Sequence, residues 1–134
     1  MSEKILIIED DDLYCELVGR VLVKEGFVVR CTNRLQEGIK LAKQDPPDAI
    51  VLDLGLPDSS ADKTVESMKQ VINTAIIVVL SGNTEAAKNC IMQSASGYLN
   101  KDDGLKYLGR EIRNAIHTHS KIQRIDSAIS GLSN

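Results

Sequence analysis

The chain has 134 residues and a formal charge of −3, from 16 Lys and Arg residues against 19 Asp and Glu residues. This length fits a single domain, and a hydrophobic fraction of 43% with 26% charged residues is typical of a soluble globular protein. The mild acidity argues against a protein that coats nucleic acid, and no apolar run reaches the about 20 residues of a membrane span.

Short apolar runs alternate with stretches of helical periodicity along nearly the whole chain. In chain order, the pattern predicts a strand at 5–8, a helix at 13–22, a strand at 27–29, a helix at 35–42, a strand at 49–54, a helix at 65–71, a strand at 75–80, a helix at 84–93, a strand at 97–99 and a long helix from about 105. Strands that alternate with helices form parallel sheets with helices on both faces. The chain is too short for a closed barrel, so the fold class is α/β with an open, doubly wound, five-stranded parallel sheet.

Polar side chains stand at the carboxyl ends of four predicted strands, where open parallel sheets bind their ligands. Glu9 and Asp10 follow the first strand, Asp53 lies within the third, Ser81 follows the fourth, and Lys101 comes just after the fifth. Taken singly, these residues read as a solvated turn, a helix cap and a surface lysine. Asp53 is harder to dismiss, because acids rarely lie inside an apolar strand. We expect one edge of the sheet to gather all five.

The residue types at this edge restrict its chemistry. Converging carboxylates without His or Cys suit Mg²⁺ or Ca²⁺ better than zinc. A carboxylate in an apolar strand is costly to ionise unless a cation lies nearby, so Asp53 needs a metal ion or Lys101 beside it. An aspartate activated in this way can form an acyl phosphate, and metal, ammonium and hydroxyl groups together stabilise a transferring phosphoryl group. The residues therefore predict phosphoryl transfer to Asp53.

An ordered set of motifs resembles the receiver domain of bacterial two-component response regulators over about residues 3–118. The motifs are Ile5-Leu6-Ile7-Ile8-Glu9-Asp10-Asp11, Leu52-Asp53-Leu54-Gly55-Leu56-Pro57, Val79-Leu80-Ser81-Gly82 and Gly97-Tyr98-Leu99-Asn100-Lys101. The resemblance implies a flavodoxin-like strand order of 2-1-3-4-5 with an extended C-terminal helix. It also implies a cytoplasmic signalling switch that takes a phosphoryl group from a histidine kinase or a histidine phosphotransfer protein.

The resemblance further implies a Mg²⁺ site and a phosphoacceptor. Glu9, Asp10 and Asp53 would hold Mg²⁺ together with the backbone carbonyl of Gly55, and Asp53 would accept the phosphoryl group. Lys101 would pair with that group. Such a domain catalyses its own aspartyl phosphorylation and dephosphorylation, and it is not an enzyme that turns over a separate substrate.

The same resemblance implies a conformational switch. Ser81 would hydrogen-bond the phosphoryl group, and its side chain would move together with the ring of Tyr98. These movements would alter the surface formed by the fourth helix, the fifth strand and the fifth helix.

Three other functions compete with this one. The serious alternative is a receiver-like protein-interaction module that works without phosphorylation, although the complete acid, Ser and Lys set favours the switch. A dehalogenase-like phosphatase would need a D-x-D motif, whereas Gly55 occupies the second position after Asp53. A flavin-binding sheet is disfavoured, because acids after the first strand would repel a flavin phosphate.

Charge and apolar pattern set the C-terminal region apart. Residues 105–134 carry a balance of +3 and residues 1–104 a balance of −6. We divide the chain into a receiver domain at 1–118 and a helical extension or linker at 119–134. The apolar residues at positions 105, 108, 112, 115, 122 and 129 fit the seam of a heptad repeat. His119 and Asp126 interrupt this seam. The extension is expected to be a homodimer contact, a linker to an effector or a frayed end.

Other features point to few further partners. No DNA-binding effector is recognisable, so we expect no direct contact with nucleic acid or membrane. The N-terminus lacks a signal-peptide pattern. Cys15, Cys31 and Cys90 form no C-x-x-C motif and are expected to be reduced.

Overall fold

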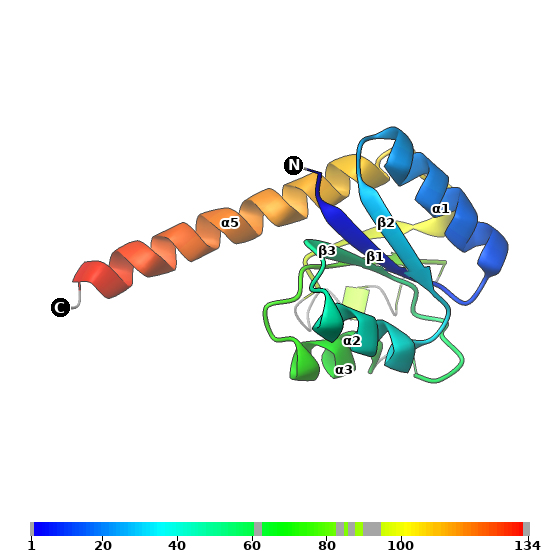
Figure 1. The fold of residues 1–134 in the computed structure, drawn as a ribbon, viewed down its shortest axis with the longest axis horizontal. Helices are drawn as coiled ribbons and strands as arrows, with labels where there is room; N and C mark the ends of the chain where they lie inside the picture. Colours follow the sequence, from blue (N-terminus) through cyan, green and yellow to red (C-terminus); the bar gives the residue numbers. More distant parts are fainter. Residues whose placement is uncertain (1, 61–62, 83–84, 86–87, 90–94, 133–134) are drawn as a thin grey trace.

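A computed structural model of the chain describes residues 2–60, 63–82, 85, 88–89 and 95–132. Its centre is a parallel five-stranded sheet in the order β2-β1-β3-β4-β5 (Figure 1). The strands are β1 (Lys4–Ile8), β2 (Val28–Thr32), β3 (Ala49–Leu52), β4 (Ile77–Ser81) and β5 (Gly97–Asn100). The helices are α1 (Asp12–Lys24), α2 (Leu35–Gln44), α3 (Thr64–Val71), the 3-10 helix η1 (Lys101–Asp103) and α5 (Leu108–Leu132). The predicted fold class and strand order are confirmed.

Alternating side chains of the strands build an apolar layer on each face of the sheet. In β1, Ile5 and Ile7 pack in one core cluster with residues of α1 and α5, whereas Leu6 and Ile8 pack in the other with residues of α2 and α3. This follows from the period of two in a strand, which sends successive side chains to opposite faces. Because helices cover both faces, all four residues are apolar and buried.

Helix α1 begins and ends at residues suited to those positions. The Asp11 carboxylate caps the helix by accepting hydrogen bonds from the backbone N–H groups of Leu13 and Tyr14, at 3.0 and 3.2 Å. After the last turn, Gly26 adopts a φ of 98°, a backbone conformation that residues other than glycine rarely adopt. Helix α1 therefore starts directly after the acids that follow β1, which fixes the path of the chain there.

The structure shifts several predicted boundaries. Strand β3 ends at Leu52, so Asp53 lies just beyond the strand and not inside it. Strand β2 continues to Thr32, beyond the predicted end at residue 29. The sequence pattern missed this part because an edge strand can contain polar residues such as Arg30, which interrupt the apolar run. The last helix starts at Leu108, after η1 and a turn. The helix predicted at 84–93 lies outside the described residues except for 85, 88 and 89.

The structure joins Cys15 of α1 to Cys31 of β2 by a disulfide, with their Cα atoms 6.6 Å apart. The expectation of reduced thiols is therefore wrong for this pair, and Cys90 lies outside the described residues. The two cysteines are 16 positions apart in the sequence, so no local motif marks them. They meet because α1 packs beside β2 as the chain crosses back to the edge of the sheet.

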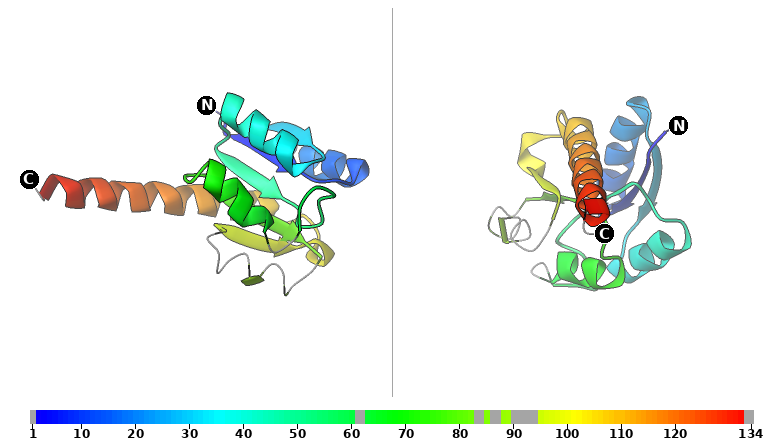
Figure 2. Two further views of the ribbon diagram at one scale, coloured as in Figure 1. Left: turned by 90° about the horizontal axis from the view of Figure 1, so that it is seen from below. Right: turned by 90° about the vertical axis from the view of Figure 1, so that its left-hand side faces the viewer.

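Helix α5 has two halves with different surroundings. In the first half, Leu108, Ile112 and Ala115 are buried against the sheet. The second half projects away from the rest of the molecule, and every residue from 121 to 131 is exposed (Figures 1 and 2). Among the described helices, none is both long and apolar enough to cross a membrane.

Candidate functional site

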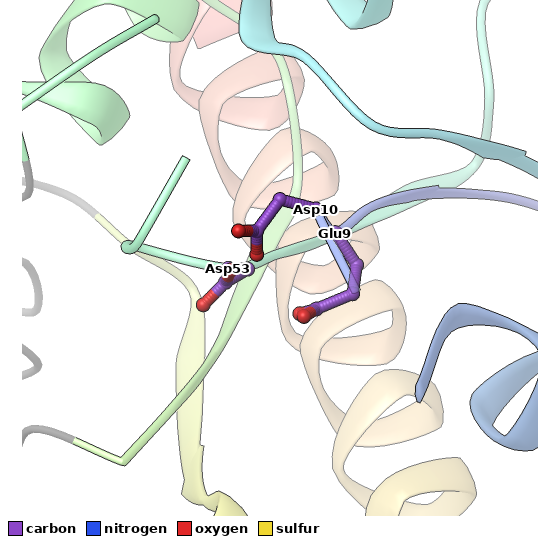
Figure 3. Close-up of side chains that lie close together, drawn as sticks. All are labelled: Glu9, Asp10 and Asp53. Atoms are coloured by element: carbon purple, nitrogen blue, oxygen red, sulfur yellow. The ribbon is translucent and has the colours of Figure 1, made fainter. Parts of the chain in front are cut away.

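Three carboxylates meet at the carboxyl edge of the sheet. Ligand oxygens of Glu9, Asp10 and Asp53, which we call the acid cluster, all lie within 4.8 Å of one another (Figure 3). Glu9 is 2% exposed and Asp53 is 6% exposed, whereas Asp10 faces solvent. The edge therefore holds two buried carboxylates and a third at its opening, as the sequence predicted.

Strand register brings the two buried acids together. Ile8 of β1 is paired with Leu52 of β3, so the residues that follow them, Glu9 and Asp53, leave the sheet side by side. Backbone hydrogen bonds extend this order past the strand ends. The Asp53 N–H donates to the Ile8 carbonyl at 2.9 Å, and the Glu9 N–H donates to the Thr32 carbonyl at 2.9 Å. The positions of both carboxylates thus follow from the parallel sheet itself.

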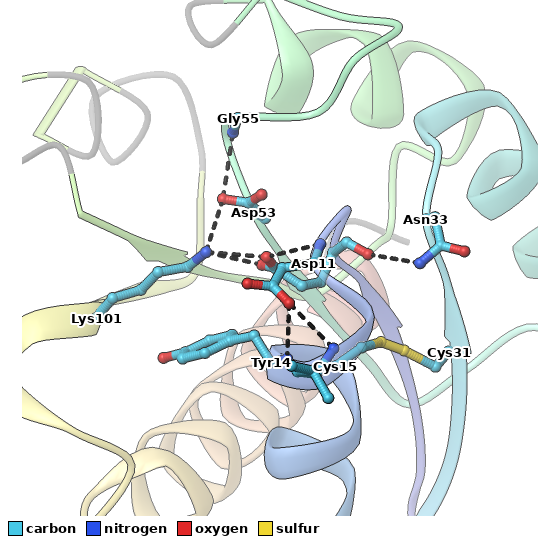
Figure 4. A network of polar contacts seen from close by, with 10 residues as sticks. Asp11, Tyr14, Cys15, Cys31, Asn33, Asp53, Gly55 and Lys101 are labelled. Atoms are coloured by element: carbon cyan, nitrogen blue, oxygen red, sulfur yellow. Dashed lines mark hydrogen bonds and ion pairs between the residues drawn. A yellow bond between two sulfur atoms is a disulfide. The ribbon is translucent and has the colours of Figure 1, made fainter.

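Lys101 supplies a positive charge to the acid cluster. Its Nζ lies 2.9 Å from Oε2 of Glu9 and 3.3 Å from Oδ1 of Asp53 (Figure 4). The lysine follows β5 directly, where η1 begins, and its side chain is 24% exposed. One ammonium cannot neutralise three carboxylates, so the site keeps an excess of negative charge that favours a further cation.

Burial and crowding change the protonation of these groups. Burial, reinforced by the charge of Asp53, raises the pKa of Glu9 to about 7, and Lys101 opposes the rise. Burial also raises the pKa of Asp53, although the Gly55 N–H donates to its Oδ1 at 3.2 Å and acts the other way. Burial alone would lower the pKa of Lys101, but Glu9 and Asp53 outweigh it and raise that pKa. Without a metal ion, both buried carboxylates thus bind protons more readily than ordinary acids.

Of the remaining predicted site residues, Ser81 and Gly55 lie at the carboxyl edge of the sheet, and Tyr98 lies within β5. Ser81 ends β4, is 4% exposed and is paired in register with Asn100, the neighbour of Lys101. Gly55 is placed next to Asp53 through its N–H group. Tyr98 of β5 is half-buried and packs against the core cluster shared by α2 and α3. The proposed roles of these three residues remain predictions.

Sequence reasoning missed Tyr14, which lies beside Lys101. The Nζ of Lys101 is 4.6 Å from the centroid of the Tyr14 ring, within cation–π range, and Figure 4 shows the ring below the lysine. Among the described residues, the Tyr14 hydroxyl is the buried side-chain polar group without a hydrogen-bond partner. The available signal was an aromatic residue in the first turn of the helix that follows the acids.

We expect the ring of Tyr14, and not its hydroxyl, to contribute to stability. Tyr14→Leu should lower the free energy of unfolding by about 1 kcal/mol, because the cation–π contact to Lys101 is lost. Tyr14→Phe should leave that free energy unchanged or raise it, because it removes a buried hydroxyl that has no partner. Urea unfolding of the two variants checks this, and equal destabilisation by both would contradict the role of the ring.

Comparisons with known proteins find relatives of this chain in sequence and in fold. The family model for the response regulator receiver domain matches residues 5–113. Over 117 residues the chain is 31% identical to the KDP operon transcriptional regulatory protein KdpE of Escherichia coli (strain K12), a match that covers 87% of this chain and 52% of KdpE. Over 82 residues it is 35% identical to the cell cycle transcriptional regulator CtrA of Caulobacter vibrioides (strain NA1000 / CB15N), covering 61% of this chain and 36% of CtrA.

A solved structure shares the fold. A response regulator receiver domain protein from Clostridium thermocellum superimposes with a TM-score of 0.81 at 22% identity, covering 90% of this chain and 98% of that one. The chain thus spans nearly all of this solved chain, but about half or less of the curated relatives.

Proposed function

The chain belongs to the response regulator receiver domain family, and we propose that it is a phosphoacceptor switch of a two-component phosphorelay with Asp53 as the acceptor. Receiver domains are signalling domains and not enzymes that turn over a separate substrate. The observation that carries the proposal is the buried Asp53 carboxylate, which lies 3.3 Å from the ammonium group of Lys101 and within the acid cluster.

The donor set of the acid cluster fits Mg²⁺. Its three carboxylates offer only oxygen atoms within 4.8 Å of one another, and Mg²⁺ binds oxygen ligands in preference to nitrogen or sulfur. Glu9, Asp10 and Asp53 would hold the ion with the backbone carbonyl of Gly55. The bound ion would neutralise negative charge on the carboxylates and on the phosphoryl oxygens. Burial raises the pKa of Glu9 and of Asp53, so their charged forms are disfavoured without a further cation. A bound Mg²⁺ would favour these charged forms, and this supports the fit.

Three residues have direct roles in the proposed phosphoryl transfer, namely Asp53, Lys101 and Ser81. An Oδ atom of Asp53 attacks the phosphorus of a phosphohistidine, so that the new O–P bond forms while the P–N bond breaks. Lys101, already within 3.3 Å of Oδ1, pairs with the negative oxygens of the transferred group, and the hydroxyl of Ser81 donates a hydrogen bond to them. The donor is a histidine kinase or a histidine phosphotransfer protein.

The output of the switch follows from Ser81 and Tyr98. We propose that Ser81 moves towards the phosphoryl group and that the half-buried ring of Tyr98 moves with it. The surface that changes contains β5 and α5, together with the fourth helix, which lies outside the described residues except for 85, 88 and 89. We place the protein in the cytoplasm and divide it into a receiver at 1–118 and a helical extension at 119–134. The family match, which ends at residue 113, supports this division.

Phosphorylation by a small phosphodonor tests the function directly. Incubation of the chain with acetyl phosphate and Mg²⁺ should add one phosphoryl group, seen as a shift of intact mass. Chelation of the metal with EDTA before the donor is added should prevent the shift, because the acid cluster then keeps its charge repulsion. An unchanged mass with Mg²⁺ present would overturn the proposal in favour of a phosphorylation-independent interaction module.

A further inference from the structure

The projecting half of α5 carries one stripe of large apolar side chains among residues that are mostly charged or polar. We define the stripe as Ile122, Ile125 and Ile129, which are 52%, 58% and 56% exposed. The charged and polar residues between them are exposed as well. Most helix stability in proteins comes from packing of an apolar face, and the three side chains of the stripe are each more than half exposed. A partner for the stripe would supply that packing.

The stripe has the spacing of a coiled-coil seam. With Ile122 and Ile129 at heptad position a, Ile125 falls at position d, and the same register runs back to the exposed Thr118 at d. The structure corrects the seam indicated by the sequence, because Leu108, Ile112 and Ala115 are buried against the sheet and unavailable to a partner. His119 and Asp126 then no longer interrupt the seam, since both fall at position e beside it.

Charges beside the seam favour one partner and one orientation. In this register Lys121 is at position g and Asp126 is at position e of the following heptad. In a parallel pair of identical helices, each g residue lies close to the e residue of the next heptad on the other helix. Lys121 of each copy would thus meet Asp126 of the other copy, giving two symmetric ion pairs. A second copy of this chain is therefore complementary to the flanks of the stripe in charge.

We propose that residues 118–131 of α5 pair with the same segment of a second copy as a parallel two-stranded coiled coil. Closed twofold dimers are the commonest homo-oligomers. The projecting part of the helix carries the seam clear of the sheet (Figure 2). The pairing buries the stripe on both helices and makes α5 a continuous connection from the receiver to the dimer contact. This inference does not depend on phosphorylation of Asp53.

The mass of the full chain in solution tests the pairing. Sedimentation equilibrium should give twice the mass of one chain at high micromolar concentration. The double variant Ile122→Asn, Ile125→Asn should give the mass of one chain with unchanged receiver phosphorylation. The matched control Ser120→Asn, Ser127→Asn places the same residue at two f positions on the opposite face of the helix and should stay dimeric. A wild-type mass of one chain or of three chains would overturn the proposal.

A charge exchange tests the parallel orientation. Lys121→Glu and Asp126→Lys should each weaken the dimer about tenfold, because each replaces two attractions with two repulsions. Their combination should restore the dissociation constant to near the wild-type value. In one chain these residues are five positions apart and do not face each other, so restoration reports a contact between copies. A combined variant as weak as the single ones would overturn the parallel register.

Discussion

Replacement of Asp53 by asparagine is expected to abolish phosphoryl uptake without harming the fold. The amide has nearly the same shape as the carboxylate, but it lacks the nucleophilic oxygen that forms an acyl phosphate. Because burial raises the pKa of Asp53, the folded protein holds the charged form only at a cost. The temperature of unfolding without metal should therefore equal or exceed that of the wild type. Intact mass after treatment with acetyl phosphate and Mg²⁺ measures the uptake.

A substitution at a second aspartate distinguishes loss of the phosphoryl acceptor from loss of one negative charge. Asp103 is exposed in η1, close to Lys101 in the sequence but outside the acid cluster. Asp103→Asn removes the same charge and should take up phosphate at the wild-type rate. Uptake by Asp53→Asn at that rate, or equal loss in both variants, would contradict the assignment of Asp53.

Replacement of Lys101 by methionine is expected to impair both stability and phosphoryl uptake. The variant leaves Glu9 and Asp53 buried together without their cation, and breaking a buried ion pair in this way costs about 3 kcal/mol. It also removes the positive charge that faces the transferred group, so the rate of uptake should fall about a hundredfold. Urea unfolding measures the first effect, and the time course of intact mass measures the second.

Lys106→Met is the matched control for this variant. Lys106 is exposed and makes a ring contact with Tyr107 at 5.5 Å, away from the acid cluster. We expect its stability and uptake to stay close to those of the wild type. If Lys101→Met also keeps its rate within about twofold, electrostatic stabilisation by the lysine is not part of the mechanism.

Much of the sheet and its acidic edge could be predicted from the sequence, because local patterns set both. A strand buried on both faces reads as a continuous apolar run, as in β1, and parallel strands bring their carboxyl ends to one edge. Glu9, Asp10, Asp53 and Lys101 therefore meet as expected. The end of β3 was misjudged, because the apolar Leu54 follows Asp53 and extends the pattern beyond the strand.

Contacts between distant elements were less predictable. The position of Tyr14 in the first turn after the acids was visible in the sequence, but its contact with Lys101 was not, since the two residues come from α1 and the end of β5. The pairing of Cys15 with Cys31 depends on how α1 packs against β2. In α5, one apolar pattern runs through a half that packs on the sheet and a half that is exposed. The register of the coiled-coil seam could therefore be assigned only after the structure showed which residues the sheet covers.

The central claim is that Asp53 carries the phosphoryl group, and mapping the modified residue tests it most directly. The chain is phosphorylated with acetyl phosphate and Mg²⁺, reduced with borohydride, which converts an acyl phosphate to an alcohol, and digested for peptide mass analysis. Homoserine at position 53 is the expected result. Conversion at Glu9, Asp10 or Asp11, with residue 53 unchanged, would contradict it.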